Sequence, residues 1–154
     1  MGAKETLHIT MAEGIISDRD ASRRFFIEVW EKYTKDIPLQ PLEQLVLEVI
    51  RDHPEYHPVL QAEEDILTRE FTPEQGLSNP FLHMGMHITI REQVSSDRPM
   101  GIRNIYEKAL QKIQSRHDLE HKMMECLGEA LWKAQRDNTL PDEANYLDCL
   151  KRII

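Results

Sequence analysis

The sequence predicts an all-α fold, a single-domain helical bundle of about four to five helices with one long helix in its C-terminal half. Apolar residues recur three to four positions apart in several stretches, and no stretch alternates apolar and polar residues over a useful length. Prolines and capping residues separate these stretches. With 154 residues, the chain can bury a core as one domain. We expect residues 18–154 to form that domain and residues 1–17 to be a loosely ordered N-terminal tail.

The first helix is predicted over residues 18–35, where Ser17 or Asp18 can act as the N-cap. Its apolar residues form one stripe at helical spacing, namely Phe25, Phe26, Val29, Trp30 and Tyr33. Pro38 breaks this pattern, because proline lacks the backbone donor that a helix interior needs. The stripe therefore predicts one amphipathic helix that ends shortly before Pro38.

A second helix is predicted from Pro41, which suits a first helical turn, to about Asp52. Its apolar positions repeat the same spacing at Leu42, Leu45, Val46, Val49 and Ile50. The segment 53–58 reads HPEYHP, and each proline restricts the residue before it. We expect a turn there that leads into a short helix through Leu60.

Three further helices are predicted in the second half of the chain. Residues 61–79 carry Pro73, Gly76 and mixed charge without a sustained period, so we expect a connecting loop. Pro80 then follows a capping asparagine and opens a helix through residue 96. The stretch 102–135 is apolar at helical spacing and predicts one long helix, and a final short helix is expected from Pro141.

Composition excludes several classes of function. There are 27 acidic and 19 basic side chains, a net charge of −8, which argues against nucleic acid as a partner. No apolar run approaches the ~20 residues that a membrane-spanning helix needs, so no membrane partner is expected. The first residues lack a secretory signal, which makes the cytoplasm the expected compartment. Cys126 and Cys149 form no recognised motif, and we expect both to be reduced thiols.

The histidines carry the strongest chemical signal. Apart from His8, they form three pairs with four-residue spacing, whereas chance placement gives about 0.3 such pairs. On a helix, this spacing puts two imidazoles on one face, where they can bind the same metal ion. The candidate metal ligands are His83, His87, His117, His121, His53 and His57. The first four lie on predicted helices, whereas the prolines around His53 and His57 make those two as compatible with a helix boundary as with ligation.

Imidazole-rich sites bind transition metals, here zinc, iron or copper, rather than calcium or magnesium. If all six histidines converge, the site is octahedral or dinuclear. Two pairs alone suffice for a mononuclear site with an open coordination position. No motif for an organic cofactor and no catalytic motif is present, so the catalytic residues stay unassigned and enzymatic activity undecided.

The main hypothesis is therefore a helical bundle that binds a transition metal through paired histidines, with an unidentified small molecule or protein as partner. The alternative is a structural or interaction module without catalytic activity. In that case, the histidines form a hydrogen-bond network in the core or an interface that responds to pH. The sequence does not indicate an oligomeric state.

Four long segments resemble one bacterial family, the family of domain of unknown function 1841. They are RRFFIEVWEKY, DHPEYHPVL, FTPEQGLSNPFLHMGMHITIREQ and HDLEHKMMECLGEALWKAQRDNTLPDEANYLDCLKR. The resemblance runs from about Arg19 to Arg152 and includes all three histidine pairs. It implies a small cytoplasmic bacterial protein, and it supplies no activity and no catalytic residue.

Overall fold

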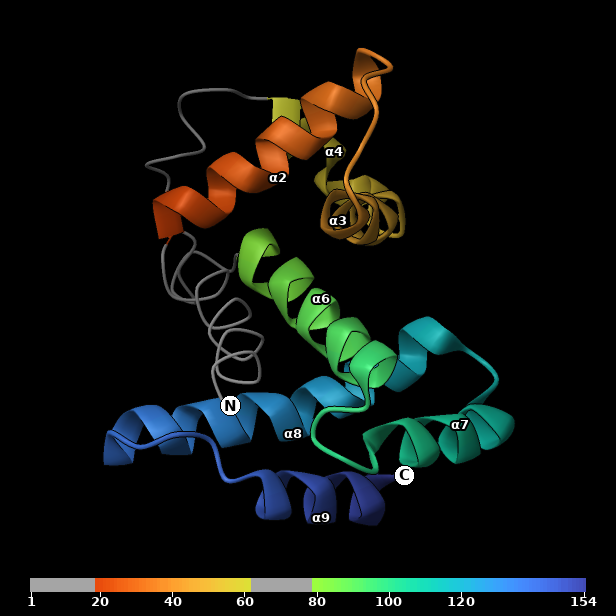
Figure 1. The fold of residues 1–154 in the computed structure, drawn as a ribbon, viewed down its shortest axis with the longest axis vertical. Coiled ribbons are helices and arrows are strands. Elements are labelled where there is room, and N and C mark those ends of the chain that lie inside the picture. The colour runs from red at the N-terminus through yellow and green to blue at the C-terminus, as the bar shows by residue number, and fades with distance from the viewer. Residues whose placement is uncertain (1–18, 62–78) are drawn as a thin grey trace. The chain divides into compact units, whose positions relative to one another are not determined.

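The computed structural model describes residues 19–61 and 79–154, and these residues confirm the all-α prediction (Figure 1). The chain divides into two compact units, residues 1–88 and residues 89–154, with the division inside one helix. The predicted tail, residues 1–17, and nearly all of the predicted loop at residues 61–79 lie outside the described residues. None of the described helices combines the length and the apolarity that crossing a bilayer requires.

The first unit contains four α-helices or parts of them and one turn of 3₁₀-helix among its described residues. These elements are α2 (Arg19–Thr34), α3 (Pro41–Arg51), η1 (Pro54–Tyr56), α4 (His57–Gln61) and the first half of α6 (Pro80–Ser96). Their bounds agree with the predicted helices to within two residues. Pro41 occupies the first turn of α3, and the Glu43 carboxylate accepts a hydrogen bond from the backbone N–H of Gln40 at 2.8 Å.

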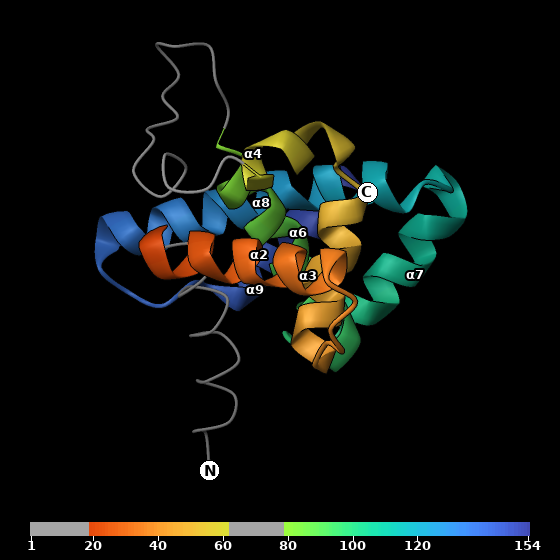
Figure 2. The same cartoon turned by 90° about the horizontal axis from the view of Figure 1, so that it is seen from above.

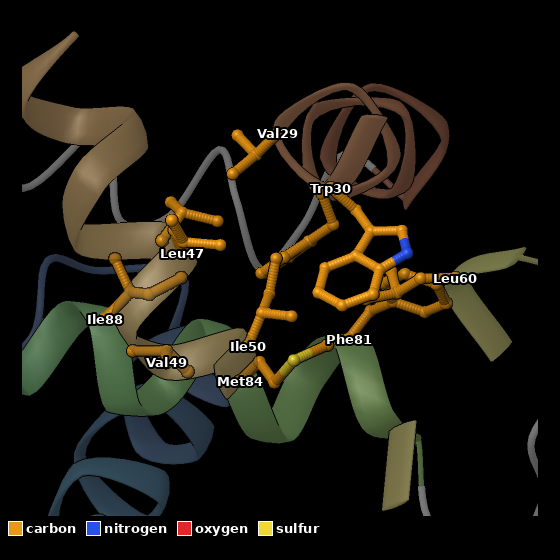
Figure 3. Packing of buried hydrophobic residues seen from close by; sticks show 11 residues of the cluster. Val29, Trp30, Leu47, Val49, Ile50, Leu60, Phe81, Met84 and Ile88 are labelled. Carbon is orange, nitrogen blue, oxygen red and sulfur yellow. The ribbon is translucent and has the colours of Figure 1, made fainter. Parts of the chain in front are cut away.

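Apolar side chains from α2, α3, α4 and α6 form the core of the first unit (Figure 3). The predicted stripes supply part of this core, namely Phe26, Val29, Trp30, Val46, Val49 and Ile50, whereas Tyr33 of the first stripe is exposed. The other core residues are Leu47, Leu60, Phe81, Met84 and Ile88. Lys32 of α2 and Glu43 of α3 add an ion pair at 2.6 Å. The core thus fixes the end of α3, which His53 follows, and the start of α6, which carries His83 and His87.

The second unit contains the end of α6 followed by α7 (Ile102–Ile113), α8 (Arg116–Asp137) and α9 (Glu143–Ile153). The prediction of one helix over 102–135 is wrong, because the chain turns sharply between α7 and α8 (Figure 2). Gln114 adopts a left-handed conformation with φ of 63°, and the Ser115 hydroxyl accepts a hydrogen bond from the backbone N–H of Asp118. This N-cap starts a new helix. The final helix begins at Glu143, capped by Asp142, two residues after Pro141.

The expectation of two reduced thiols is also wrong. Cys126 of α8 and Cys149 of α9 form a disulfide, and the described residues hold no free cysteine. Helices α8 and α9 pack against each other, which brings the two Cα atoms to 5.8 Å, inside the range that a disulfide spans. The 23-residue separation follows no recognised motif, so only the packing of the two helices brings the cysteines together.

Candidate metal centre

His83 and His87 lie one turn apart on α6. This helix starts at Pro80, and the Asn79 side chain caps it by accepting hydrogen bonds from the backbone N–H groups of Phe81 and Leu82. The Nε2 atoms of the two imidazoles are 3.2 Å apart. Two nitrogens on a tetrahedral ion with bonds of ~2.1 Å are about 3.4 Å apart. The pair therefore already has the separation of two ligands of one ion.

His53 comes from a different element. It follows the end of α3 and precedes Pro54, and its φ of −125° turns the chain out of the helix. The ring centroid of His53 lies 5.1 Å from that of His83 and 4.8 Å from that of His87. One nitrogen from each of the three rings falls within 4.8 Å of the other two. His53 and His87 are buried and His83 is half-buried, so the first unit gathers three imidazoles in a largely dry environment.

A backbone carbonyl fixes the tautomer of His53. Its Nδ1 lies 2.8 Å from the carbonyl oxygen of Val49, one turn back on α3. A carbonyl oxygen only accepts hydrogen bonds, so Nδ1 carries the proton and donates it. The lone pair is then on Nε2, the atom through which the ring can bind a cation. Hydrogen bonds of this kind orient the imidazole ligands of protein-bound metals.

Tyr56 supports the same group of rings, although the sequence analysis did not single it out. Its ring stacks on His53 with an interplanar angle of 6° and a centroid distance of 5.4 Å. It also meets the His83 ring at 6.2 Å, edge to face. The only sequence signal was the position of Tyr56 between two histidines in the HPEYHP segment.

His57, the second member of the first predicted pair, lies outside this group. Its Nε2–H donates to the carbonyl oxygen of Ile50 at 2.9 Å, and its ring packs on Trp30 with centroids 4.5 Å apart. His53 and His57 are four residues apart, but α3 ends before His53 and α4 begins at His57. The two rings therefore do not share a helix face.

His117 and His121 lie in the second unit, on α8, where their ring centroids are 4.2 Å apart. The structure thus brings this pair together as the spacing predicts. Between them in sequence lies the buried Glu120, whose carboxylate accepts hydrogen bonds from Nε of Arg91 at 3.1 and 3.2 Å and from Nε of Arg116 at 3.3 Å. The Glu120 carboxylate is therefore held between two guanidinium groups.

The charges around Glu120 also affect a nearby tyrosine. Burial raises the pKa of Tyr106, and the negative charge of Glu120 acts in the same direction. Glu125, the other carboxylate close to the second histidine pair in sequence, is exposed on α8. Its position is that of a solvated surface residue.

The group in the first unit, which we call the histidine triad, consists of His53, His83 and His87. Three neutral imidazoles are a known ligand set for zinc that leaves one position for water or a substrate. Iron and copper also accept this set. With a ligand at the open position, such an ion can act as a Lewis acid.

The comparisons with known proteins give one match. The family model described as domain of unknown function (DUF1841) matches residues 18–152, so the chain belongs to this family, as its resemblance indicated. Searches among curated proteins and among solved structures gave no match.

Proposed function

We propose that this member of the family binds one transition-metal ion, with zinc as the best-fitting metal, through Nε2 of His53, His83 and His87. The observation that carries the proposal is the convergence of three imidazoles from two separate elements, one of them with its tautomer fixed by the Val49 carbonyl.

An open coordination position on the ion would allow it to take part in a reaction. Three protein nitrogens leave a tetrahedral ion one ligand short, and the fourth place would take water or a small substrate. Zinc bound in this way lowers the pKa of a bound water to about 7, which suits hydrolytic chemistry. The proposal extends to Lewis-acid chemistry in general, and it selects no substrate.

Elemental analysis of protein purified without a histidine tag tests the proposal. We expect about one ion per chain for the wild type and less than ~0.1 for His83→Ala, because two remaining imidazoles bind a metal weakly. Tyr56→Phe is the matched control, since it keeps the ring that stacks on His53. Circular dichroism establishes that both variants retain their helices. A wild type that binds no zinc, iron or copper after reconstitution overturns the proposal.

One observation also favours the alternative, a histidine network in the core without a metal. The 3.2 Å between the two Nε2 atoms of His83 and His87 is also a hydrogen-bond distance. The two functions differ in the effect of zinc on unfolding. If the site binds zinc, free zinc at 100 times the dissociation constant raises the free energy of unfolding by about 2.7 kcal/mol. If the histidines form only a hydrogen-bond network, added zinc leaves the free energy of unfolding unchanged.

A further inference from the structure

The disulfide between α8 and α9 exposes its two sulfur atoms unequally. Cys126 is 1% exposed, while Cys149 is only partly buried. Thiol–disulfide exchange begins when a thiolate attacks one sulfur, and access decides which sulfur is attacked. A reagent from solvent therefore meets Cys149 first.

Both cysteines line an open pocket of about 500 Å³ formed by α8, α9 and the turn that joins them. This volume falls in the range of ~300 to 1,000 Å³ that sites for small molecules occupy. All residues that line the pocket belong to the second unit, and none of them is a member of the histidine triad. An attacking molecule at Cys149 would thus be partly enclosed rather than on a flat surface.

Charged side chains of both signs surround the disulfide in this pocket. Glu129 has Oε2 3.9 Å from Sγ of Cys149, and its Oε1 pairs with Nζ of Lys133 at 3.0 Å. Arg152 and Asp148 also line the pocket, on α9. A lining with both signs complements a molecule that carries an ammonium group and carboxylates together.

We propose that Cys149 is a thiol–disulfide exchange site, and that its pocket binds a zwitterionic low-molecular-weight thiol, namely an amino-acid or short-peptide thiol. In the first step, the thiolate of this molecule attacks Sγ of Cys149. A new S–S bond forms to Cys149, the bond to Cys126 breaks, and Cys126 leaves as a thiolate that takes a proton from water.

The second step completes the exchange. A second thiolate attacks the sulfur of the bound thiol, releasing the symmetrical small-molecule disulfide and Cys149 as a thiolate. Two thiols are oxidised and the protein disulfide is reduced, so electrons balance. In the reverse direction, Cys126 resolves the mixed disulfide, because it is the sulfur next to Cys149 on the opposite helix.

Two single-cysteine variants test the position of attack. Cys126→Ser leaves Cys149 as the sole thiol and Cys149→Ser leaves Cys126, since the chain has two cysteines. With oxidised glutathione as the probe, intact-mass spectrometry measures the growth of the mixed disulfide. We expect Cys149 to react at least about 10-fold faster than Cys126, because only Cys149 is accessible in the fold.

Equal rates, or faster reaction of Cys126, overturn the proposal. If either variant loses its helices by circular dichroism, the reduced wild type replaces it. Pulsed alkylation with iodoacetamide and peptide mass spectrometry then compare the two thiols in one chain. The same order of reactivity is expected, and the reverse order contradicts the proposal.

A second measurement tests the binding of a zwitterion. The rate at which reduced glutathione opens the wild-type disulfide is compared with that of 2-mercaptoethanol, each relative to its rate on a small linear disulfide. We expect a preference for glutathione of at least about 5-fold, because charge complementarity in the pocket favours a zwitterion. For the same reason, we expect this preference to fall in high salt and in the double variant Lys133→Gln/Arg152→Gln. Equal relative rates for the two thiols contradict the proposal that the pocket binds a zwitterionic thiol.

Discussion

The two units differ in how they use their buried polar groups. In the second unit, two such groups have partners of complementary charge or hydrogen-bonding capacity: Arg91 binds Glu120, and the Tyr146 hydroxyl donates to Oε1 of Gln93 at 2.7 Å. In the first unit, the histidine triad brings together three groups of one kind, each able to present a nitrogen lone pair. Complementary partners stabilise a fold without a further ligand. Several nitrogen lone pairs directed at one point are instead the arrangement that binds a cation.

The same contrast applies to the two histidine pairs with uninterrupted helical spacing. His83 and His87 in the first unit have a third imidazole beside them, supplied from the end of α3. In the second unit, His117 and His121 flank Glu120, whose charge is balanced by arginine. Four-residue spacing therefore identifies pairs of adjacent rings, and the surrounding elements determine what each pair can do. That His117 and His121 also bind a metal stays a prediction from the sequence.

The largest effect is expected from Glu120→Ala. The side chains of Arg91 and Glu120 are 4% and 1% exposed, so removal of the carboxylate leaves a buried guanidinium without its counter-charge. Breaking such a pair costs about 3 to 5 kcal/mol of unfolding free energy. Urea denaturation followed by circular dichroism measures the loss. Glu125→Ala, on the exposed face of the same helix, is the control and should stay within ~0.5 kcal/mol.

A double replacement sharpens this result. In Arg91→Met/Glu120→Leu, both charges are replaced by apolar side chains of similar size, and such replacements are often neutral or stabilising. We therefore expect the double variant to recover most of the stability that Glu120→Ala loses. Unchanged stability in Glu120→Ala itself would contradict the view that charge pairing holds the second unit together.

The disulfide is expected to have the next largest effect, and to act only on the second unit. A link across 23 residues restricts the unfolded chain, which on the chain-entropy model stabilises the fold by about 3 kcal/mol. Cys126→Ser should lower the unfolding free energy by that amount. Metal binding by the first unit should be unchanged, because its ligands belong to residues 1–88. Parallel zinc titrations of oxidised and reduced protein check this, and a large loss of affinity on reduction would contradict the separation of the two roles.

His53→Ala tests whether the third ring makes the difference between the two histidine pairs. Mutation of a residue that only hydrogen-bonds to a metal ligand typically weakens metal binding by about 10- to 100-fold. Because His53 is proposed to be a ligand itself, we expect its loss to weaken zinc binding by more than ~100-fold. Competition with a chromophoric chelator measures the dissociation constant. His57→Gln and His117→Ala are the matched controls, because neither side chain belongs to the histidine triad. A His53→Ala variant with the affinity of the wild type would show that the third ring is not a ligand.

Local sequence signals predicted most of the helices and both pairs of adjacent rings, because these depend on residues close in the chain. The break between α7 and α8 was missed although Ser115 and Asp118 have the spacing of a helix start and residues 114–118 are all polar, since apolar residues recur at helical spacing on both sides of it. The prolines around His53 and His57 left a helix boundary as open as ligation, and a helix boundary does separate the two residues, because α3 ends at Arg51 and α4 begins at His57. The convergence of His53 on α6 and of Cys126 on Cys149 depends on tertiary packing, which no local spacing encodes.

The smallest effect is expected in alkali, in the second unit. Burial raises the pKa of Tyr146, so the folded state keeps the phenol proton at a pH where the unfolded chain, with an ordinary pKa of about 10, has lost it. Its contribution to stability is complete below pH ~10 and is lost as the pH rises above that value.

Tyr146→Phe should therefore flatten the fall of unfolding free energy between pH ~10 and ~11. At neutral pH, the same variant should lose about 1 kcal/mol, because the hydrogen bond to Gln93 is absent. Urea titrations at both pH values compare it with Tyr33→Phe, the replacement of an exposed tyrosine. Equal slopes for Tyr146→Phe and the wild type would contradict a raised pKa of Tyr146 in the folded state.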